Sequence, residues 1–169
     1  KDYMRGAEQF VERIKTAIFA PMHFSEDYRG GNAFRTFAES RGCRFLTISR
    51  RGESFATAED AVYINKGDVY EDENIRIEAF GSTDVGISFL IDLQGVRLFH
   101  AGDLNNWHWS EESTPQEIRK AEGDFLAEIK NLQQKAPRVD IAMFPVDSRI
   151  GKDYMRGAEQ FVERIKTAI

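Results

Sequence analysis

The chain has 169 residues, of which 41% are hydrophobic, and its formal net charge is -5. This composition is sufficient for a hydrophobic core of domain size, and the scattered basic residues exclude the clustered Lys and Arg of a nucleic-acid interface. No apolar run approaches the roughly 20 residues of a membrane span. Cys43 is the only cysteine, so no internal disulfide can form. We therefore expect a cytoplasmic protein that binds neither nucleic acid nor membrane.

Residues 152–169 repeat residues 1–18 letter for letter (KDYMRGAEQFVERIKTAI). Repeat proteins stack many similar units, whereas here a single element recurs without any difference at the two ends of the chain. This pattern indicates a rearranged chain, either an engineered circular permutant with one duplicated element or an open reading frame closed on itself. We interpret residues 1–169 as a single domain whose parental order is 56–151 followed by 1–55.

The hydrophobic pattern predicts alternating helices and strands, and therefore an α/β fold. The repeated segment has apolar residues at helical spacing, which predicts the same amphipathic helix at both ends of the chain. After the first copy, the pattern predicts a strand over 19–24, a helix over 32–41 and a strand over 44–49. Residues 56–74 are interpreted as a connection that contains one weak strand at 61–64.

Three successive strands are predicted over 75–80, 86–93 and 96–99. The second and third are joined by Gln94–Gly95, a pair suited to a tight turn, so the three strands should form an antiparallel group.

Residues 114–117 (TPQE) have the residue types of a capping box with proline at the first helical position. They predict a helix from Pro115 to about Gln134. A last strand is expected over 139–146, followed by a loop at 147–151 and the second copy of the repeated helix.

Polar side chains follow four of the predicted strands at the point where each strand ends. Asp103 comes after a buried strand and beyond Gly102, which lets the backbone turn sharply. The segment 81–84 (GSTD), Asp147 and His23 end the other three strands. If these ends share one sheet edge, they form a pocket of the kind that α/β folds use for ligands. The structural alternative is a turn or helix cap for each aspartate and a packed position for the histidine.

Four segments of the chain belong together: 80–91 (FGSTDVGISFLI), 98–109 (LFHAGDLNNWHW), 143–147 (MFPVD) and 20–24 (APMHF). These segments resemble the metallo-β-lactamase superfamily, in its branch of small bacterial metallo-hydrolases. The resemblance covers nearly all of the non-repeated sequence, and its most specific part is the second of these segments. In this family an αββα sandwich consists of two similar sheet-plus-helix halves, with metals between them at the strand ends. The resemblance implies the C-terminal half of that sandwich, a mixed sheet with helices on one face.

The resemblance also implies roles for individual residues. Asp103 matches the carboxylate that bridges two metal ions in the family, an oxygen ligand suited to zinc or another divalent metal, and His23 matches the last histidine ligand. Many relatives carry a further histidine ligand where this chain has Ser82. Each of the two other histidines would orient a ligand by a hydrogen bond or be packed in the core. The pocket around the ligands is expected to hold Ser82, Asp84, His100, His108 and Asp147.

The superfamily signature H-x-H-x-D-H, which supplies most of the metal ligands, does not occur in this sequence. A catalytic zinc needs about three protein ligands and a water, and the resemblance supplies two ligands. The chain is therefore interpreted as a fragment or permutant of a metal-dependent hydrolase that is catalytically incomplete, with weak or absent metal binding. The alternative is an active hydrolase whose metal site is completed in trans by another chain. A nucleotide-binding module is disfavoured, because Gly81 and Gly102 belong to no phosphate-loop motif.

We also expect a homo-oligomer. In the family, the second face of the sheet packs on the half that is missing here, and an exposed apolar face of that size normally finds a partner. The two identical helices compete for one position in the fold. The spare copy can fill the same position in a neighbouring chain, which is domain swapping.

Overall fold

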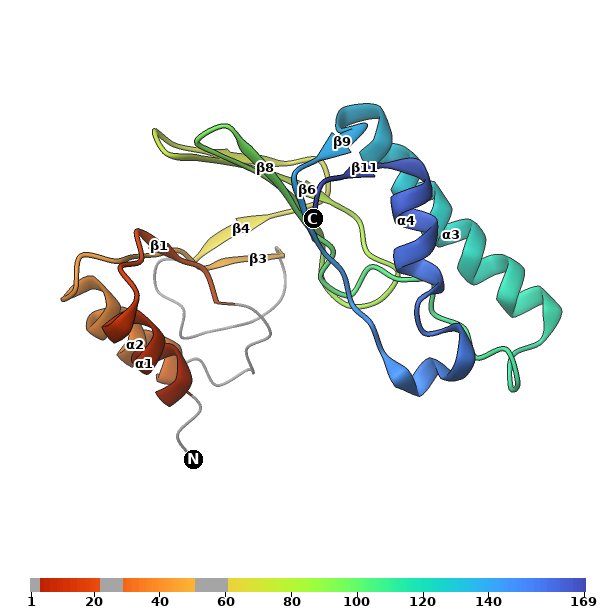
Figure 1. Cartoon of the computed structure of the whole chain (residues 1–169), viewed down its shortest axis with the longest axis horizontal. Coiled ribbons are helices and arrows are strands. Elements are labelled where there is room, and N and C mark those ends of the chain that lie inside the picture. Colours follow the sequence, from red (N-terminus) through yellow and green to blue (C-terminus); the bar gives the residue numbers. More distant parts are fainter. Residues whose placement is uncertain (1–3, 22–28, 51–60) are drawn as a thin grey trace. The chain divides into compact units, whose positions relative to one another are not determined.

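The computed structural model describes residues 4–21, 29–50 and 61–169. Its chain forms two compact units, Lys1–Tyr63 and Ile64–Ile169. Both units combine helices with β-strands, and Figure 1 shows the elements of each. In the described residues no helix is both long enough and apolar enough to cross a membrane.

The first unit packs two helices beside short strands. Its core contains Val11 of the first helix together with Phe34, Ala38 and Phe45. The Phe34 ring lies edge-on to Phe45, with centroids 5.7 Å apart. The two strands that precede and follow the second helix run parallel, so the chain between them is a crossover connection. Its elements are α1 (Arg5–Arg13), β1 (Ile18–Phe19), α2 (Arg29–Glu39), β2 (Arg44–Phe45), β3 (Ile48–Arg50) and β4 (Val62–Ile64), whose last residue is the first of the second unit.

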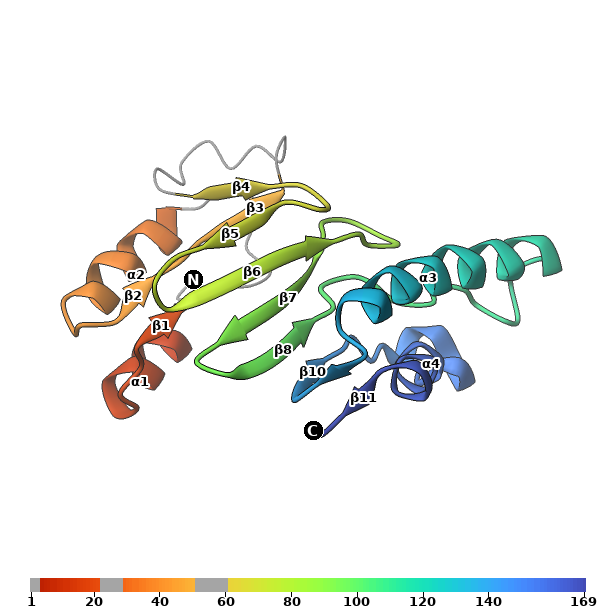
Figure 2. The same ribbon diagram turned by 90° about the horizontal axis from the view of Figure 1, so that it is seen from above.

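The second unit is built on a five-stranded mixed sheet with the strand order β10-β8-β7-β6-β5. Neighbours from β5 to β8 are antiparallel, and β10 runs parallel to β8. Figure 2 shows these strands side by side. The last strand, β11, pairs in parallel with β9. The elements are β5 (Val69–Glu71), β6 (Ile75–Phe80), β7 (Ser88–Leu93), β8 (Val96–His100), α3 (Pro115–Lys135), β9 (Arg138–Val139), β10 (Ile141–Met143), the 3-10 helix η1 (Ser148–Asp153), α4 (Arg156–Arg164) and β11 (Lys166–Thr167).

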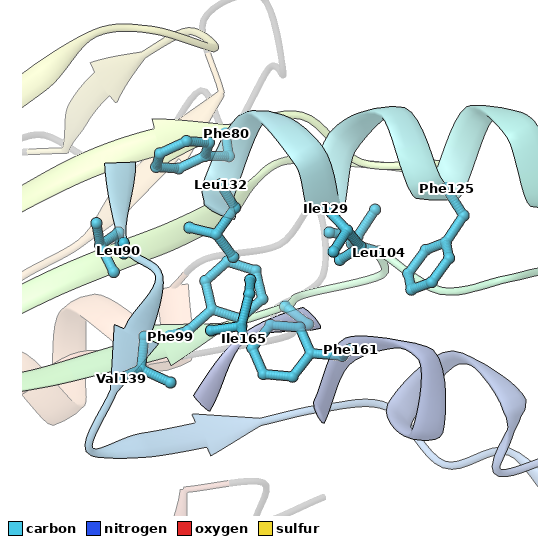
Figure 3. Packing of buried hydrophobic residues seen from close by; sticks show 12 residues of the cluster. Phe80, Leu90, Phe99, Leu104, Phe125, Ile129, Leu132, Val139, Phe161 and Ile165 are labelled. Carbon is cyan, nitrogen blue, oxygen red and sulfur yellow. The ribbon is translucent and has the colours of Figure 1, made fainter. Parts of the chain in front are cut away.

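Helices α3 and α4 cover the same face of this sheet. Leu90 and Phe99, which are cross-strand partners on β7 and β8, point toward the helices. Ile129 of α3 and Phe161 of α4 complete the layer, and Figure 3 shows these side chains converging in one cluster. The predicted α/β fold, a mixed sheet with helices on one face, is therefore confirmed in this unit.

Most predicted elements of the second unit are observed. The three central strands form the expected antiparallel group, and Gln94–Gly95 makes their turn with positive φ at both residues. At the start of α3, the Thr114 side chain accepts from the Glu117 N–H, and Glu117 accepts from the Thr114 N–H. The capping box and the proline at the helix start are therefore confirmed.

Four local predictions are wrong. The strand expected at 44–49 is divided into β2, which pairs with β1, and β3, which pairs with β4. The connection 56–74 contains a further strand, β5, at its end. The strand expected at 139–146 is interrupted at Asp140, because β9 pairs with β11 whereas β10 pairs with β8. The Asp140 carboxylate accepts from the Arg97 N–H at this change of partner. The loop after Asp147 is the 3-10 helix η1, with the Asp147 side chain accepting from the Arg149 N–H.

Candidate functional site

Three of the four predicted polar strand ends lie on one edge of the sheet in the second unit. β6 and β8 both run antiparallel to β7, and β10 runs parallel to β8, so β6, β8 and β10 all end at the same edge. Ser82 follows β6, Asp103 follows β8 and Asp147 follows β10. The fourth strand end carries His23, which lies outside the described residues.

Asn105 connects the three loops that follow these strands. The Thr83 hydroxyl donates to the Asn105 carbonyl (2.6 Å) and accepts from the Asn105 N–H (3.1 Å). The Asn105 side-chain amide donates to the Pro145 carbonyl (3.4 Å), and its Oδ1 accepts from the Asn106 N–H (2.8 Å). Asn105 is almost fully buried, so these bonds satisfy polar groups that have little access to water. No role is predicted for Asn105 from the sequence, although it lies within the most specific part of the resemblance.

Asp103 sits in the turn that follows β8. Gly102 precedes it with a φ of 57°, and a Cβ at Gly102 would lie 2.8 Å from the Ile87 carbonyl oxygen. The predicted requirement for glycine at this turn is therefore confirmed. The Asp103 carbonyl accepts from the Trp107 indole N–H (2.7 Å), which closes the loop, and the Asp103 side chain is partly buried.

His100 is the last residue of β8 and is partly buried. Its Nδ1 accepts a hydrogen bond from the Gly102 N–H (3.1 Å), which holds the ring against the turn that leads to Asp103. Burial lowers the pKa of His100, and the nearby Asp103 carboxylate opposes part of that effect.

His108 is buried beneath α4, where it joins a network of polar groups. Its Nδ1 lies 2.9 Å from Asn106 Oδ1, and Arg156 of α4 contacts Nε2. Asn106 in turn donates to the Gln160 side chain (2.9 Å). Burial lowers the pKa of His108, and the positive charge of Arg156 lowers it further. The described partners of His108 therefore attach α4 to the loop after β8.

The other predicted pocket residues have local partners. Ser82 Oγ accepts from the Asp84 N–H (3.2 Å), and the Asp84 side chain is exposed. Asp147 caps η1 and pairs with Arg149, and the hydrogen bonds from Arg149 lower the pKa of the Asp147 carboxyl. In the described parts of the chain, no three His, Cys, Asp or Glu side chains are grouped so that they could hold a metal ion. The described side chains around Asp103 therefore do not fit a metal centre by themselves.

A pocket of about 210 Å³ lies beside this edge, and α3 provides most of its wall. Its charged side chains already have partners. Glu117 belongs to the capping box, and Lys120 pairs with Asp124. The pocket therefore presents no unpaired charge to a ligand. Its lining residues are Thr83, Trp107, Glu117, Lys120, Ala121 and Asp124.

Solved structures share this fold at low sequence identity. A protein from Parabacteroides distasonis ATCC 8503 named as a metal-dependent hydrolase aligns with 89% of this chain and 62% of its own length, at 17% identity and a TM-score of 0.54. A variant of CmlA beta-hydroxylase aligns with 89% of this chain and 34% of its own, at 10% identity and a TM-score of 0.52. A metallo-beta-lactamase from Staphylococcus aureus subsp. aureus COL aligns with 97% and 57%, at 17% identity and a TM-score of 0.42. No family model and no curated protein match the sequence.

The likeness to the first two structures shows that this chain shares their fold. The chain spans 62% of the length of the first protein and 34% of the second. The structural neighbours thus include a protein named as a metal-dependent hydrolase, and the α/β arrangement of the sheet and helices is common to them and to this chain.

The two histidines predict how the stability of the second unit depends on pH. Both bind a proton less readily in the folded unit than in the unfolded chain, where the histidine pKa is near 6.5. Their contribution to stability is therefore complete above about pH 6.5 and declines as the pH falls below it. We expect a lower urea midpoint at about pH 5.5 than at about pH 7.5. Fluorescence of Trp107 and Trp109, the only tryptophans, measures it.

The control for this prediction is the double variant His100→Gln, His108→Gln. It lacks both titrating groups, so its urea midpoint should change less between the two pH values than the midpoint of the unsubstituted chain. An unsubstituted midpoint that is equal or higher at the acidic pH would contradict the assignment of the two histidines as neutral groups.

Proposed function

We propose that this chain is part of a metallo-β-lactamase-fold, metal-dependent hydrolase and is catalytically incomplete on its own. The observation that carries the proposal is the position of Asp103. It follows β8 on the edge where β6 and β10 also end, and the resemblance assigns it to the bridging carboxylate. The two units are proposed to belong to one half-domain, in the order 56–151 followed by 1–55.

The proposed incompleteness follows from the ligand set. The signature H-x-H-x-D-H does not occur in the sequence, and the proposed ligands are Asp103 and His23. A zinc ion held by two protein ligands lacks the closed coordination that makes protein sites tight. Zinc or another divalent metal would polarise a bound water in the parental enzyme. In this chain His100 holds the turn before Asp103 through the Gly102 N–H.

Zinc binding tests this proposal. We expect weak binding by the full-length chain in calorimetry, and no change in its melting temperature when zinc is added at concentrations near that of the protein, because stabilisation depends on the ratio of free ligand to Kd. In the absence of metal, Asp103→Ala should have the same melting temperature as the unsubstituted chain. Asp84→Ala is the matched control, since Asp84 is an exposed carboxylate at a neighbouring strand end.

The alternative is a site completed in trans by another chain. It predicts one tightly bound zinc per chain, lost in Asp103→Ala and retained in Asp84→Ala, with binding that strengthens as the protein concentration rises. That result would overturn the proposal of an incomplete enzyme.

A further inference from the structure

The two copies of the repeated helix bury different faces. In α1 the residues that pack on the core of the first unit are Met4, Ala7 and Val11, which we call the valine face. In α4 the residues that pack on the second unit are Arg156, Gly157, Gln160, Phe161 and Ile165, which we call the phenylalanine face. The two faces share no position of the repeat. At 100° per residue the centres of the two faces lie roughly 140° apart on the helix.

Each copy exposes the face that the other copy buries. Phe161 is 1% exposed, whereas its counterpart Phe10 is 47% exposed. Val11 is 7% exposed, whereas its counterpart Val162 is 57% exposed. The entire phenylalanine face of α1 is exposed, including Arg5, Gly6, Gln9, Phe10 and Ile14.

The backbone after each helix is paired within its own unit. In the first unit the Ala17 carbonyl accepts from the N–H of Arg44 in β2, and the Phe19 carbonyl accepts from the N–H of Leu46 just after β2 (2.9 Å each). In the second unit Ala168, the counterpart of Ala17, donates to the Val139 carbonyl (3.3 Å). Position 17 of the repeat is therefore paired in both copies, and the difference between the copies lies in their helix faces.

The second unit defines what covers the phenylalanine face. The Phe161 ring lies 5.3 Å from Phe99 and 5.2 Å from Phe144 between ring centroids. Figure 3 shows Phe161 and Ile165 inserted in the cluster with Phe99. Arg156 contacts His108, and Gln160 bonds to Asn106 and to Glu122. We call this surface the α4 seat. It comprises Phe99, Asn105, Asn106, His108, Glu122 and Phe144.

We propose that the phenylalanine face of α1 is an interaction surface for a second copy of this chain, and that it enters the α4 seat of that copy in exchange for α4. The seat contacts are conserved in the exchange, because the two sequences are identical. α1 arrives already ordered on α2, whereas a displaced α4 regains conformational freedom. Reciprocal exchange between two copies gives a closed dimer of the domain-swapped kind.

The connections of the chain favour α1 of a second copy, rather than α1 of the same chain, as the occupant of the α4 seat. In its own chain α1 continues through β2 and β3, and β3 pairs with β4. β4 leads through residues 65–68 into β5, which is the edge strand farthest from β10 in the strand order. The seat strand β11 pairs beyond β10, on residues 138–142. α1 of a second copy is not connected to the seat through these strands.

The test uses full-length Phe161→Asp, which places a charge in the apolar part of the seat contact and so releases α4. We expect its mass in analytical ultracentrifugation to double relative to Phe10→Asp, with tryptophan fluorescence of a folded second unit. Its melting temperature should rise with protein concentration, because association stabilises by mass action. In the double variant Phe10→Asp, Phe161→Asp both the dimer and the folded fluorescence should be lost. Val162→Asp, on the exposed face of α4, is the matched control. Its mass and its tryptophan fluorescence should equal those of the unsubstituted chain.

Two results would overturn the proposal. If Phe161→Asp and the double variant are alike in mass and fluorescence, whether folded or unfolded, α1 does not enter the seat. Phe161→Asp could instead be a folded monomer whose melting temperature does not change with protein concentration and whose folded fluorescence is lost in the double variant. In that case α1 fills the seat of its own chain. The milder pair Phe161→Ala and Phe10→Ala, Phe161→Ala gives the same comparison if aspartate prevents expression. Neither result depends on metal binding, so this test is independent of the proposed function.

Discussion

At protein concentrations low enough to keep the chain monomeric, Phe161→Ala should destabilise the second unit by about 3–5 kcal/mol, the range for deleting a fully buried aromatic ring. Its counterpart Phe10→Ala should cost less than about 1 kcal/mol in the first unit, because nearly half of the Phe10 side chain is exposed. Both substitutions occur in the same sequence context, so intrinsic helix propensity cancels between them. The difference therefore measures tertiary burial alone.

Each unit carries its own probe for this measurement. Both tryptophans, Trp107 and Trp109, lie in the second unit, and the single cysteine, Cys43, is buried in the first. Urea unfolding followed by tryptophan fluorescence reports the second unit, and the rate of thiol labelling at Cys43 reports the first. Burial also raises the pKa of the Cys43 thiol, so labelling requires opening of that core.

The control is the pair of substitutions at the valine position of the repeat, which is buried in α1 and exposed in α4. Val11→Ala should cost about 1–2 kcal/mol in the first unit, from the loss of buried methyl groups. Val162→Ala should stay within about 0.5 kcal/mol in the second unit, because Val162 is exposed. Equal costs for Phe161→Ala and Phe10→Ala, or for the two valine substitutions, would contradict the assignment of opposite faces to the two copies.

Gly157→Ala and Gly6→Ala should change stability in opposite directions. A Cβ at Gly157 would overlap the Asn105 side-chain oxygen and lie 3.2 Å from the Asn106 nitrogen, whereas a Cβ at Gly6 would meet nothing within 4 Å. Gly6→Ala should stabilise the first unit by about 0.5–1 kcal/mol, because alanine loses less backbone entropy in a helix. Gly157→Ala should destabilise the second unit by about 2 kcal/mol or more, from overpacking and from the displaced hydrogen bonds of Asn105.

A double-mutant cycle locates the cause of the Gly157 effect. Asn105→Ala removes the oxygen that the new methyl group would overlap, and it also removes the links to Pro145 and Asn106. Gly157→Ala should therefore cost less in the Asn105→Ala background than in the unsubstituted chain, with a coupling of about 1 kcal/mol or more between residues in contact. Additive effects would show that the close approach of α4 to Asn105 is not the source of the loss.

Local pattern was sufficient for most elements of the second unit. The capping box at Thr114 and Glu117 uses atoms within one helical turn, so its residue types predict the helix start directly. The alternation over 75–80 and the Gln94–Gly95 turn likewise depend on neighbours in sequence. The strand β5 was not predicted, because its hydrophobic pattern is weak. It has three residues, and two of them are exposed. The break at Asp140 was not predicted either, because it arises from a change of pairing partner.

The candidate site was only partly accessible to sequence reasoning. The polar strand ends were identifiable, and the antiparallel register around β7 brings Ser82, Asp103 and Asp147 to one edge. Asn105 was not identifiable as their connection, because its partners Thr83 and Pro145 lie 22 and 40 residues away in sequence. A side chain that joins three loops has no signature in the local pattern of any one of them.

The sequence by itself determined that residues 5–13 and 156–164 form the same amphipathic helix, since propensity and hydrophobic spacing are identical in the two copies. It could not determine which face each copy buries, because the repeat has apolar residues on two faces. That choice was made by tertiary structure. In the first unit α2 presents Phe34 and Ala38, and the helix turns its valine face to them. In the second unit the sheet and the loop after β8 present Phe99 and Asn105, and the same helix turns its phenylalanine face to those residues, because burial free energy depends on the surface that a side chain meets.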